Sequence, residues 1–435
     1  MLNFLFTKTP LMFFYQSFWR DEAFSYVLAH KNLGELLVAT AKDFNPPLYY
    51  LILKLWMMIF GKSEIALRSL SFICFWLTIY TVYLFLTNVY KFSWKKSYAY
   101  LLLVVINPLL VYYALEVRMY SLFAFLATLS FYALIRKKNK LYLWATIAGL
   151  YTHYFMIFAL GGQLLYVFLT TKKKDWQLFV KQIAICCAAY LPWIIFFLRF
   201  KDWQTTNGFW ILKESLPKLI NLLGVIYTGY ENNFHFFDKN LIYLSAALTL
   251  VIVFTLIKNH SRIKHKPVIY ILTIWAILIP LGVWIFSFIK PIFLPRYLIF
   301  TTVGLLLFLI YAIDQFNIFL RLLIILPLVL ITINYHRLQI KEREKVNFRK
   351  LFQEINKVAG KNDLVYVTNE LDYFSALYYF KTNQVYIYGK SYAEIPAFVG
   401  KVLIPKESIV IQLPRFPKKA FVINSDYSYN IQAEF

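Results

Sequence analysis

The sequence has few charged residues, few acidic residues and little cysteine. Charged residues make up 16% of its 435 positions, against about 25% in soluble domains. Asp and Glu number 22, against 46 Lys and Arg. The cysteines, Cys74, Cys186 and Cys187, all lie in apolar runs and two of them are neighbours. They therefore form neither a disulfide framework nor a set of metal ligands with the usual spacing.

Apolar residues dominate the composition instead. Hydrophobic residues are 60% of the chain and the mean hydropathy is +0.56, which is typical of a polytopic α-helical membrane protein. The net charge of +24 lies in short runs between apolar stretches, and this pattern marks cytoplasmic loops rather than a nucleic-acid surface. Membrane lipids are therefore expected as partners, and nucleic acid is not.

Apolar runs long enough to cross a bilayer predict the membrane helices. They lie at 65–90, 97–113, 119–135, 176–200, 241–257, 268–289, 297–313 and 318–334. The run 141–170 is either one overlong helix or two short ones. At the chain start, residues 1–19 contain Lys8 and Pro10 and no signal-peptide cleavage site. A first span there is either truncated or crosses imperfectly.

Basic runs predict the topology. They lie at 91–96, 136–140, 172–174 and 258–266. If 136–140 and 172–174 are both cytoplasmic, the segment between them is a hairpin of two short spans, with YTHYF at its outer turn. The opposite, extracytoplasmic face then receives loop 20–60, the turn at 116–118, loop 201–240, the PRY at 295–297 and everything after Tyr335.

These patterns predict two domains. A multi-span membrane domain covers 1–340, and its outer loop 20–60 carries juxtamembrane helices, including an amphipathic one at 46–60. A small soluble α/β domain covers 341–435. Its expected elements are a helix at 348–358, strands in LVYVT, QVYIY, SIVIQL and AFVIN, and a second helix in DYFSALYYF. It has no glycine-rich phosphate loop, so nucleotide binding is not expected.

Polar residues at the membrane boundary are the candidates for chemistry. Asp21 and Glu22 are adjacent, so on a helix they diverge by about 100° and suit two different tasks; alternatively they are acids favoured at a helix start. Asp43 and Asn45 precede Pro46-Pro47, where they either bind a ligand or cap the helix that follows.

Glu116 and Arg118 would be costly inside the membrane, at roughly 2.5–3.5 kcal/mol each, so we expect them at the interface, next to Tyr120. Residues two apart on a helix point about 200° away from each other, so the two charges address different partners, either a ligand or neighbouring helices. Asn107-Pro108 upstream allows the preceding span to bend over a cavity.

Three further residues can each be interpreted in two ways. His153 in YTHYF is either a ligand-binding or acid–base group or an aromatic-belt residue. Arg296, followed by Tyr297, either binds a lipid phosphate or snorkels to the interface. Arg68 has the same two interpretations as Arg296, phosphate binding or snorkelling.

Taken in order, these motifs resemble the PMT-like branch of the GT-C glycosyltransferases, which includes protein O-mannosyltransferases and aminoarabinose transferases acting on lipid A. The matching elements are WRDEAFS, NPPLYYLILKLW after an acidic residue, FGKSEIALRSLS, NPLLVYYALEVRMYSL, YTHYF and LPRYL, over residues 17–300. The resemblance departs at Asn45, where relatives often have histidine, and this weakens any case for a bound divalent metal, the one cofactor left open.

The resemblance implies transfer of a sugar from a polyprenyl-phosphate donor to a protein, lipid or glycan acceptor outside the cytoplasm. It assigns the base that deprotonates the acceptor hydroxyl to Asp21. Cations that stabilise the leaving phosphate would be Arg118, Arg296 and Arg68. Glu22, Asp43, Asn45, Glu116 and His153 would orient the sugar or acceptor, or hold the cations. The alternative is a transporter or flippase of lipid-linked sugars, which would typically show paired half-sequences with interrupted helices; none is evident.

Overall fold

The computed structural model describes residues 7–43, 45–201, 211, 215–231, 239–259, 267–382 and 384–435. These residues form mostly helices and one five-stranded sheet. They divide into two compact units, and each is described by itself. The first unit comprises 1–13, 68–195 and 211–343, and the second comprises 14–67, 196–210 and 344–435. The predicted boundary at 340/341 separates a membrane domain from a soluble one, whereas these units are defined by compactness alone. The predicted boundary therefore stays a prediction.

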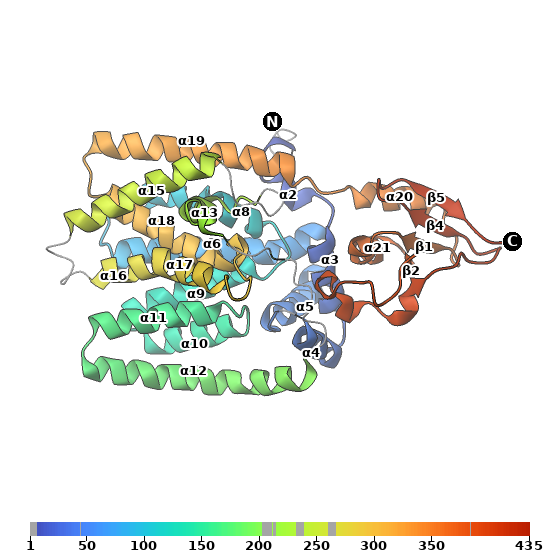
Figure 1. Ribbon diagram of the computed structural model, residues 1–435, viewed down its shortest axis with the longest axis horizontal. Helices are drawn as coiled ribbons and strands as arrows, with labels where there is room; N and C mark the ends of the chain where they lie inside the picture. The colour runs from blue at the N-terminus through green and yellow to red at the C-terminus, as the bar shows by residue number, and fades with distance from the viewer. Residues whose placement is uncertain are drawn as a thin grey trace. The chain divides into compact units, whose positions relative to one another are not determined.

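The first unit is a bundle of long apolar helices (Figure 1). Its elements are α6 (Glu64–Asn88), α7 (Trp94–Val105), α8 (Pro108–Ala114), α9 (Tyr120–Ile135), α10 (Asn139–Leu150), α11 (Met156–Thr170), α12 (Lys173–Phe200), α14 (Leu222–Thr228), α15 (Lys239–Lys258), α16 (Pro267–Thr273), the π-turn η3 (Ile274–Leu278), α17 (Ile279–Phe286), the 3-10 turn η4 (Pro295–Leu298), α18 (Ile299–Ile313) and α19 (Ile318–Glu342). Within the described residues, six helices are long and apolar enough to cross a membrane, and a seventh span is counted if a bent pair is one span. The chain is therefore a multi-pass membrane protein.

The predicted spans all coincide with helices, and two finer predictions are confirmed. The run 97–113 breaks at Asn107-Pro108 into α7 and α8, which are bent by 74°. There the Asn107 side chain accepts a hydrogen bond from the Leu110 amide and donates one to the Tyr227 carbonyl. The run 141–170 is two helices, α10 and α11, which pack together. In the described part of 1–19 the structure has only short helical pieces, among them α2 (Met12–Tyr15).

The core of the first unit surrounds α18. This helix is buried over most of its length and packs on α9, α14, α15 and η3. Gly304 allows the closest approach, because a Cβ added there would lie 2.6 Å from the Trp275 ring. Trp275 in turn stacks on Phe131 at 4.1 Å. By contrast, α12 and α19 expose most of their apolar surface, as helices facing lipid do.

The two ends of α9 and α18 carry different chemistry. At their C-terminal ends, Asp314 pairs with Lys96 at 2.6 Å and with Arg321 at 3.5 Å, while Arg136 donates to the Asn88 carbonyl. These residues lie beside the basic runs of the sequence. Arg118 and Arg296 precede the N-terminal ends of the same two helices, so they lie at the other end of the bundle.

The second unit combines the loop 20–60 with the C-terminal α/β domain. From the loop come α3 (Arg20–His30), α4 (Leu33–Lys42) and α5 (Leu48–Phe60). The C-terminal part contributes α20 (Phe348–Val358), β1 (Leu364–Val367), η5 (Glu370–Asp372), α21 (Tyr373–Tyr379), β2 (Val385–Tyr388), β3 (Ile409–Val410), β4 (Ala420–Ile423) and β5 (Tyr429–Gln432). The strand order is β3-β2-β1-β4-β5, parallel except for β5. Every element predicted here from the sequence is present, and β5 is additional.

Lys54 explains how α5 meets α3. Its position in the middle of an apolar helix is unusual, but its amino group donates to the carbonyls of Ala29 (3.3 Å) and Lys31 (2.6 Å) at the end of α3. A cation at a helix C-terminus satisfies carbonyls that have no partner within the helix. One face of α5 is buried and the other exposes Leu55, Met58 and Ile59, as expected of an amphipathic helix.

Candidate functional site

In the first unit, five of the predicted residues lie in one group, named here the arginine–tyrosine cluster: Arg118, Tyr120, His153, Arg296 and Tyr297. Three separate chain segments bring them there, namely the α8–α9 turn, the α10–α11 turn and η4. The Arg118 guanidinium lies 5.7 Å from the Tyr120 ring, and the Arg296 guanidinium lies 5.8 Å from the Tyr297 ring. The His153 ring lies 5.9 Å from Tyr120 and 5.2 Å from Tyr297. Sequence motifs far apart in the chain therefore converge.

His153 is held as a neutral hydrogen-bond donor. Its Nδ1 accepts the Phe155 backbone N–H at 3.1 Å, so in the neutral ring the proton is on Nε2. Burial, together with Arg118 and Arg296, lowers the His153 pKa to about 3. The buried Nε2 has no hydrogen-bond partner among the described residues. The Nε2–H therefore faces the protein interior, and both interpretations of His153, as a ligand-binding or acid–base group and as an aromatic-belt residue, stay predictions.

The sequence did not predict two charged residues that belong with this cluster. Glu231 lies 3.5 Å from the Arg296 guanidinium. Arg343 lies over the Tyr112 ring at 4.3 Å and donates to the Gly229 carbonyl at 3.3 Å, while Tyr112 also hydrogen-bonds Glu116. Arg343 lies directly after α19, within the stretch that the sequence predicts to be soluble.

Glu116 and Arg118 are both buried. As expected, they address different partners, because Glu116 interacts with Tyr112 and Arg343, whereas Arg118 faces Tyr120 and its carbonyl accepts from Ser71. Arg68 is fully buried within α6, so snorkelling to the interface is wrong for it. Together with Glu116, Glu231 and Arg343, the cluster therefore combines guanidiniums and carboxylates with tyrosine hydroxyls and the neutral His153.

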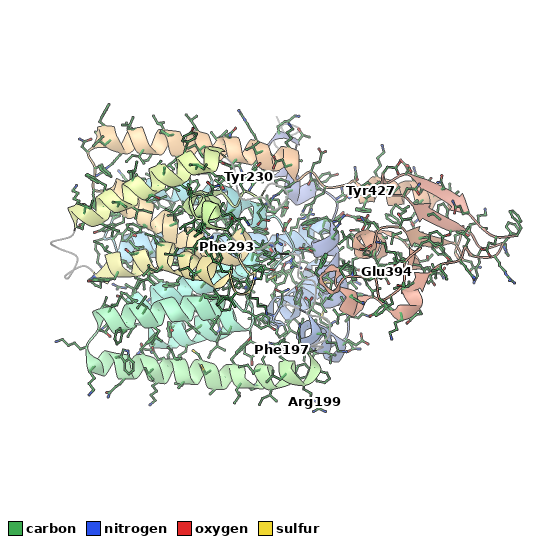
Figure 2. The ribbon with its side chains drawn as sticks, viewed as in Figure 1. Phe197, Arg199, Tyr230, Phe293, Glu394 and Tyr427 are labelled. Atoms are coloured by element: carbon green, nitrogen blue, oxygen red, sulfur yellow. The ribbon has the colours of Figure 1, made fainter. Side chains whose placement is uncertain are left out.

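Neighbouring aromatic residues support the cluster from the α14–α15 side. Tyr230, labelled in Figure 2, packs on Tyr335 at 5.4 Å and donates its hydroxyl to Glu342 at 3.1 Å. It follows Gly229, which has φ of +63° and lies so close to Leu109 that an added Cβ would sit 2.3 Å from it. Only glycine fits both the backbone conformation and the contact.

In the second unit, the adjacent acids Asp21 and Glu22 have different surroundings. Both lie in the first turn of α3, as the helix-start interpretation expected. Glu22 is fully buried and pairs with Lys345 at 2.9 Å, whereas Asp21 is half-buried. Asp21 is thus the one accessible to a substrate.

Asp43 and Asn45 also belong to the second unit. The Asn45 side chain donates to the Asp43 carboxylate at 3.5 Å. Helix α5 begins after Pro47, without a side-chain cap, so the interpretation of Asp43 or Asn45 as its N-cap is wrong. Among the described residues, no group of three or more His, Cys, Asp or Glu side chains could hold a metal ion, and the chemistry below is written without one.

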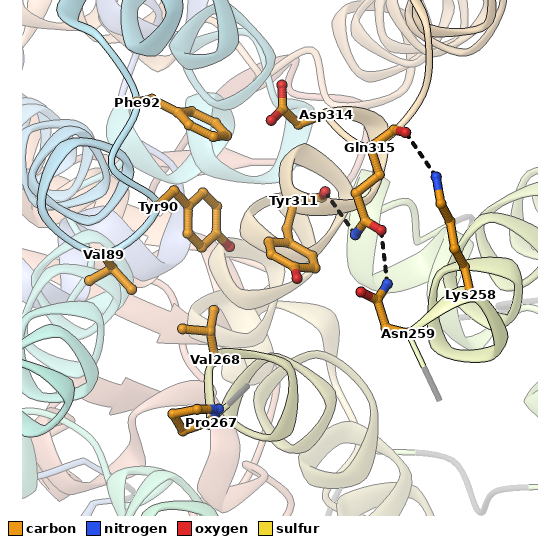
Figure 3. A pocket seen from close by; sticks show the side chains of 10 residues that line it. All are labelled: Val89, Tyr90, Phe92, Lys258, Asn259, Pro267, Val268, Tyr311, Asp314 and Gln315. Carbon is orange, nitrogen blue, oxygen red and sulfur yellow. Dashed lines mark hydrogen bonds between the residues drawn. The ribbon is translucent and has the colours of Figure 1, made fainter. Parts of the chain in front are cut away.

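A cavity of about 610 Å³ lies at the other end of the first unit (Figure 3). Its wall includes the rings of Tyr90, Phe92 and Tyr311 and the polar groups of Lys258, Asn259, Asp314 and Gln315. Asn259 donates to Gln315 at 2.8 Å. None of the sequence-predicted site residues lines it.

Comparison with known proteins gives the fold a precedent. Neither a protein-family model nor a curated protein matches the chain. Among solved structures, ArnT from Cupriavidus metallidurans in the apo state is similar with a TM-score of 0.64 and 13% identity, over 95% of this chain and 89% of that one. The same protein bound to undecaprenyl phosphate gives 0.62 and 14%, over 98% and 94%. The chain therefore has the GT-C-type polytopic membrane fold that the motifs predicted, with a small C-terminal sheet region.

Proposed function

We propose that the chain is a glycosyltransferase that moves a sugar from a polyprenyl-phosphate donor to an acceptor hydroxyl on the extracytoplasmic face of the membrane. The observation that carries the proposal is the arginine–tyrosine cluster. Buried guanidiniums and a buried neutral N–H donor, at the end of the bundle away from the basic runs, suit a lipid phosphate. That ArnT, which shares the fold, has been crystallised with undecaprenyl phosphate supports this choice of donor.

The proposed reaction is a single displacement at the anomeric carbon. The acceptor oxygen forms the new glycosidic bond while the bond between the anomeric carbon and the phosphate oxygen breaks, and the acceptor proton passes to the Asp21 carboxylate. Polyprenyl phosphate leaves with the electron pair of the broken bond. The anomeric configuration is inverted.

The other residues have supporting roles in this proposal. Arg118 and Arg296 take up the charge that develops on the leaving phosphate, and His153 donates Nε2–H without adding charge. The rings of Tyr120 and Tyr297 line the same site beside the arginines and His153. Arg68 is a further candidate cation for the phosphate, Glu116 holds the buried charges of the cluster in place, and Asp43 with Asn45 orients sugar or acceptor.

Turnover of a defined donor tests the function. Purified protein is given polyprenyl-phosphate sugar and an acceptor extract, and release of the lipid phosphate is measured. Asp21→Asn should lower the rate by a factor on the order of 10² or more with donor binding retained. Glu35→Gln, which alters an exposed carboxylate of α4 paired with Lys31, should have little effect. Donor crossing the bilayer without cleavage would identify a flippase instead.

Labelling of single cysteines tests the membrane face. Positions 138 and 173 are predicted to be cytoplasmic, whereas 371–430 are predicted to be outside. Labelling of both groups from the same side would contradict this topology.

A further inference from the structure

We propose that Lys345 and Asp372 are positioning residues that fix the Asp21 carboxylate by holding the residues on either side of it. This inference rests on the proposed function for the role of Asp21. All contacts involved lie within the second unit.

The contact on one side of Asp21 is the Glu22–Lys345 pair. Glu22 follows Asp21 directly, and its carboxylate lies 2.9 Å from the Lys345 amino group. The two side chains are 0% and 4% exposed. The Lys345 amino group also lies 5.8 Å from the Trp19 ring. A charged pair so completely removed from water tolerates little movement of either partner.

The contact on the other side is the Arg20–Asp372 pair. Arg20 precedes Asp21, and its guanidinium lies 3.7 Å from the Asp372 carboxylate in η5. Arg20 also hydrogen-bonds Tyr427, which follows β4. Burial raises the pKa of Asp372, and Arg20 opposes that shift.

Helix α3 needs such contacts because its own start is poorly capped. Trp19 occupies the N-cap position in an extended conformation and makes no side-chain capping bond, although a cap is worth roughly 1 kcal/mol in most helices. Contacts from the C-terminal part replace it. The Tyr379 hydroxyl accepts the Phe18 amide at 2.8 Å, and Phe24 packs on Phe374 at 5.4 Å. Gly400 leaves no room for a Cβ beside Phe24.

The contacts of the two residues beside Asp21 can be broken one at a time. Among the described residues, Glu22 contacts Lys345 before α20, and Arg20 contacts Asp372 in η5 and Tyr427 after β4. Glu22→Gln leaves Lys345 without its counter-charge, and Asp372→Asn does the same to Arg20. In each variant the contact that holds one neighbour of Asp21 is lost.

The experiment measures kcat and donor KM for Glu22→Gln, Lys345→Met and Asp372→Asn. We expect kcat to fall on the order of 10-fold in each, with donor KM unchanged, because the Asp21 carboxylate is displaced rather than removed. Hydrogen exchange of the α3 amides should quicken in all three.

Glu64→Gln is the matched control. It also changes a carboxylate to an amide and leaves a cation, Arg349, whose guanidinium lies 2.8 Å from Glu64 in the parent. It should lower thermal stability without lowering kcat. In the double variant Glu22→Gln/Lys345→Met, which buries no lone charge, stability should recover while kcat stays low.

Two results would overturn the proposal: unchanged exchange in α3, or parent-level kcat in the double variant. Loss of activity in Glu22→Gln but not in Lys345→Met would make Glu22 itself catalytic and also contradict it. Failure of the proposed function is distinct, because then the parent protein releases no lipid phosphate, while the exchange measurement still tests the positioning contacts.

Discussion

Arg296 and Glu231 form a largely buried ion pair, with 3.5 Å between the guanidinium and the carboxylate and with the two side chains 15% and 6% exposed. Arg296 heads α18, where the sequence offered snorkelling or phosphate binding as explanations. The pair brings a carboxylate into the same cluster, so any phosphate there competes with Glu231 for the guanidinium.

Glu231→Gln should therefore lower thermal stability but strengthen the binding of lipid phosphate. Without ligand, thermal stability in detergent should fall, because removal of one partner from a buried pair costs roughly 3–5 kcal/mol. Polyprenyl phosphate should bind more tightly than to the parent and restore much of the lost stability. Weaker lipid-phosphate binding in this variant would show that Glu231 holds the phosphate site together rather than competing with it.

Arg118 should require its guanidinium and not only its charge. A guanidinium can donate two parallel hydrogen bonds to phosphate oxygens, which a lysine cannot. Arg118→Lys should weaken donor binding, and Arg118→Ala should weaken it more, by roughly 2–5 kcal/mol if the pair is desolvated. Arg136→Lys, at the other end of the bundle, is the control. Normal donor affinity with reduced thermal stability would assign Arg118 to structure and move the search to Arg296 or Arg68.

The lowered pKa of His153 predicts that the folded protein loses stability in acid. Its pKa in the folded protein is lowered to about 3 by burial and by two arginines, whereas the unfolded value is about 6.5. The folded state therefore binds fewer protons, and stability present above about pH 6.5 is lost as pH falls toward about 3, by roughly 1.4 kcal/mol per pH unit. His153→Gln should flatten this dependence in thermal melts between pH 4 and 7. An identical slope in both proteins would mean that His153 does not stay neutral.

Gly304 tests the packing around α18. Gly304→Ala places a methyl group against the Trp275 ring, which cannot retreat because it stacks on Phe131. We expect a loss of roughly 1–3 kcal/mol. Gly282→Ala in α17 is the matched control, because nothing lies within 4 Å of its added Cβ, and it should stabilise the protein by roughly 0.5–1 kcal/mol. Similar melting temperatures for the two variants would refute this packing.

Hydropathy predicted the helices well because an apolar segment that crosses a membrane has few alternatives to a helix. A backbone in lipid must satisfy its own hydrogen bonds, so each apolar run of sufficient length became a helix, and Asn107-Pro108 broke one. The strand β5 was missed because its sequence, YNIQ, is mostly exposed and lacks a clear apolar alternation.

The candidate site was predicted only in part, for a related reason. Arg118, His153 and Arg296 stand out because each interrupts an apolar stretch. Glu231 and Arg343 were missed because their roles depend on partners distant in the chain, Arg296 and Tyr112. Likewise, adjacent Asp21 and Glu22 look equivalent until Lys345, 323 residues later, pairs with one of them.

The separation between Glu22 and Lys345 also bears on how the protein is made. At roughly 5–20 residues per second, the ribosome needs on the order of 15–65 s to synthesise the 323 residues between them. During that time α3 lacks the partners that cover Glu22, Phe24 and Arg20. The second unit can therefore close only after the whole bundle has been synthesised.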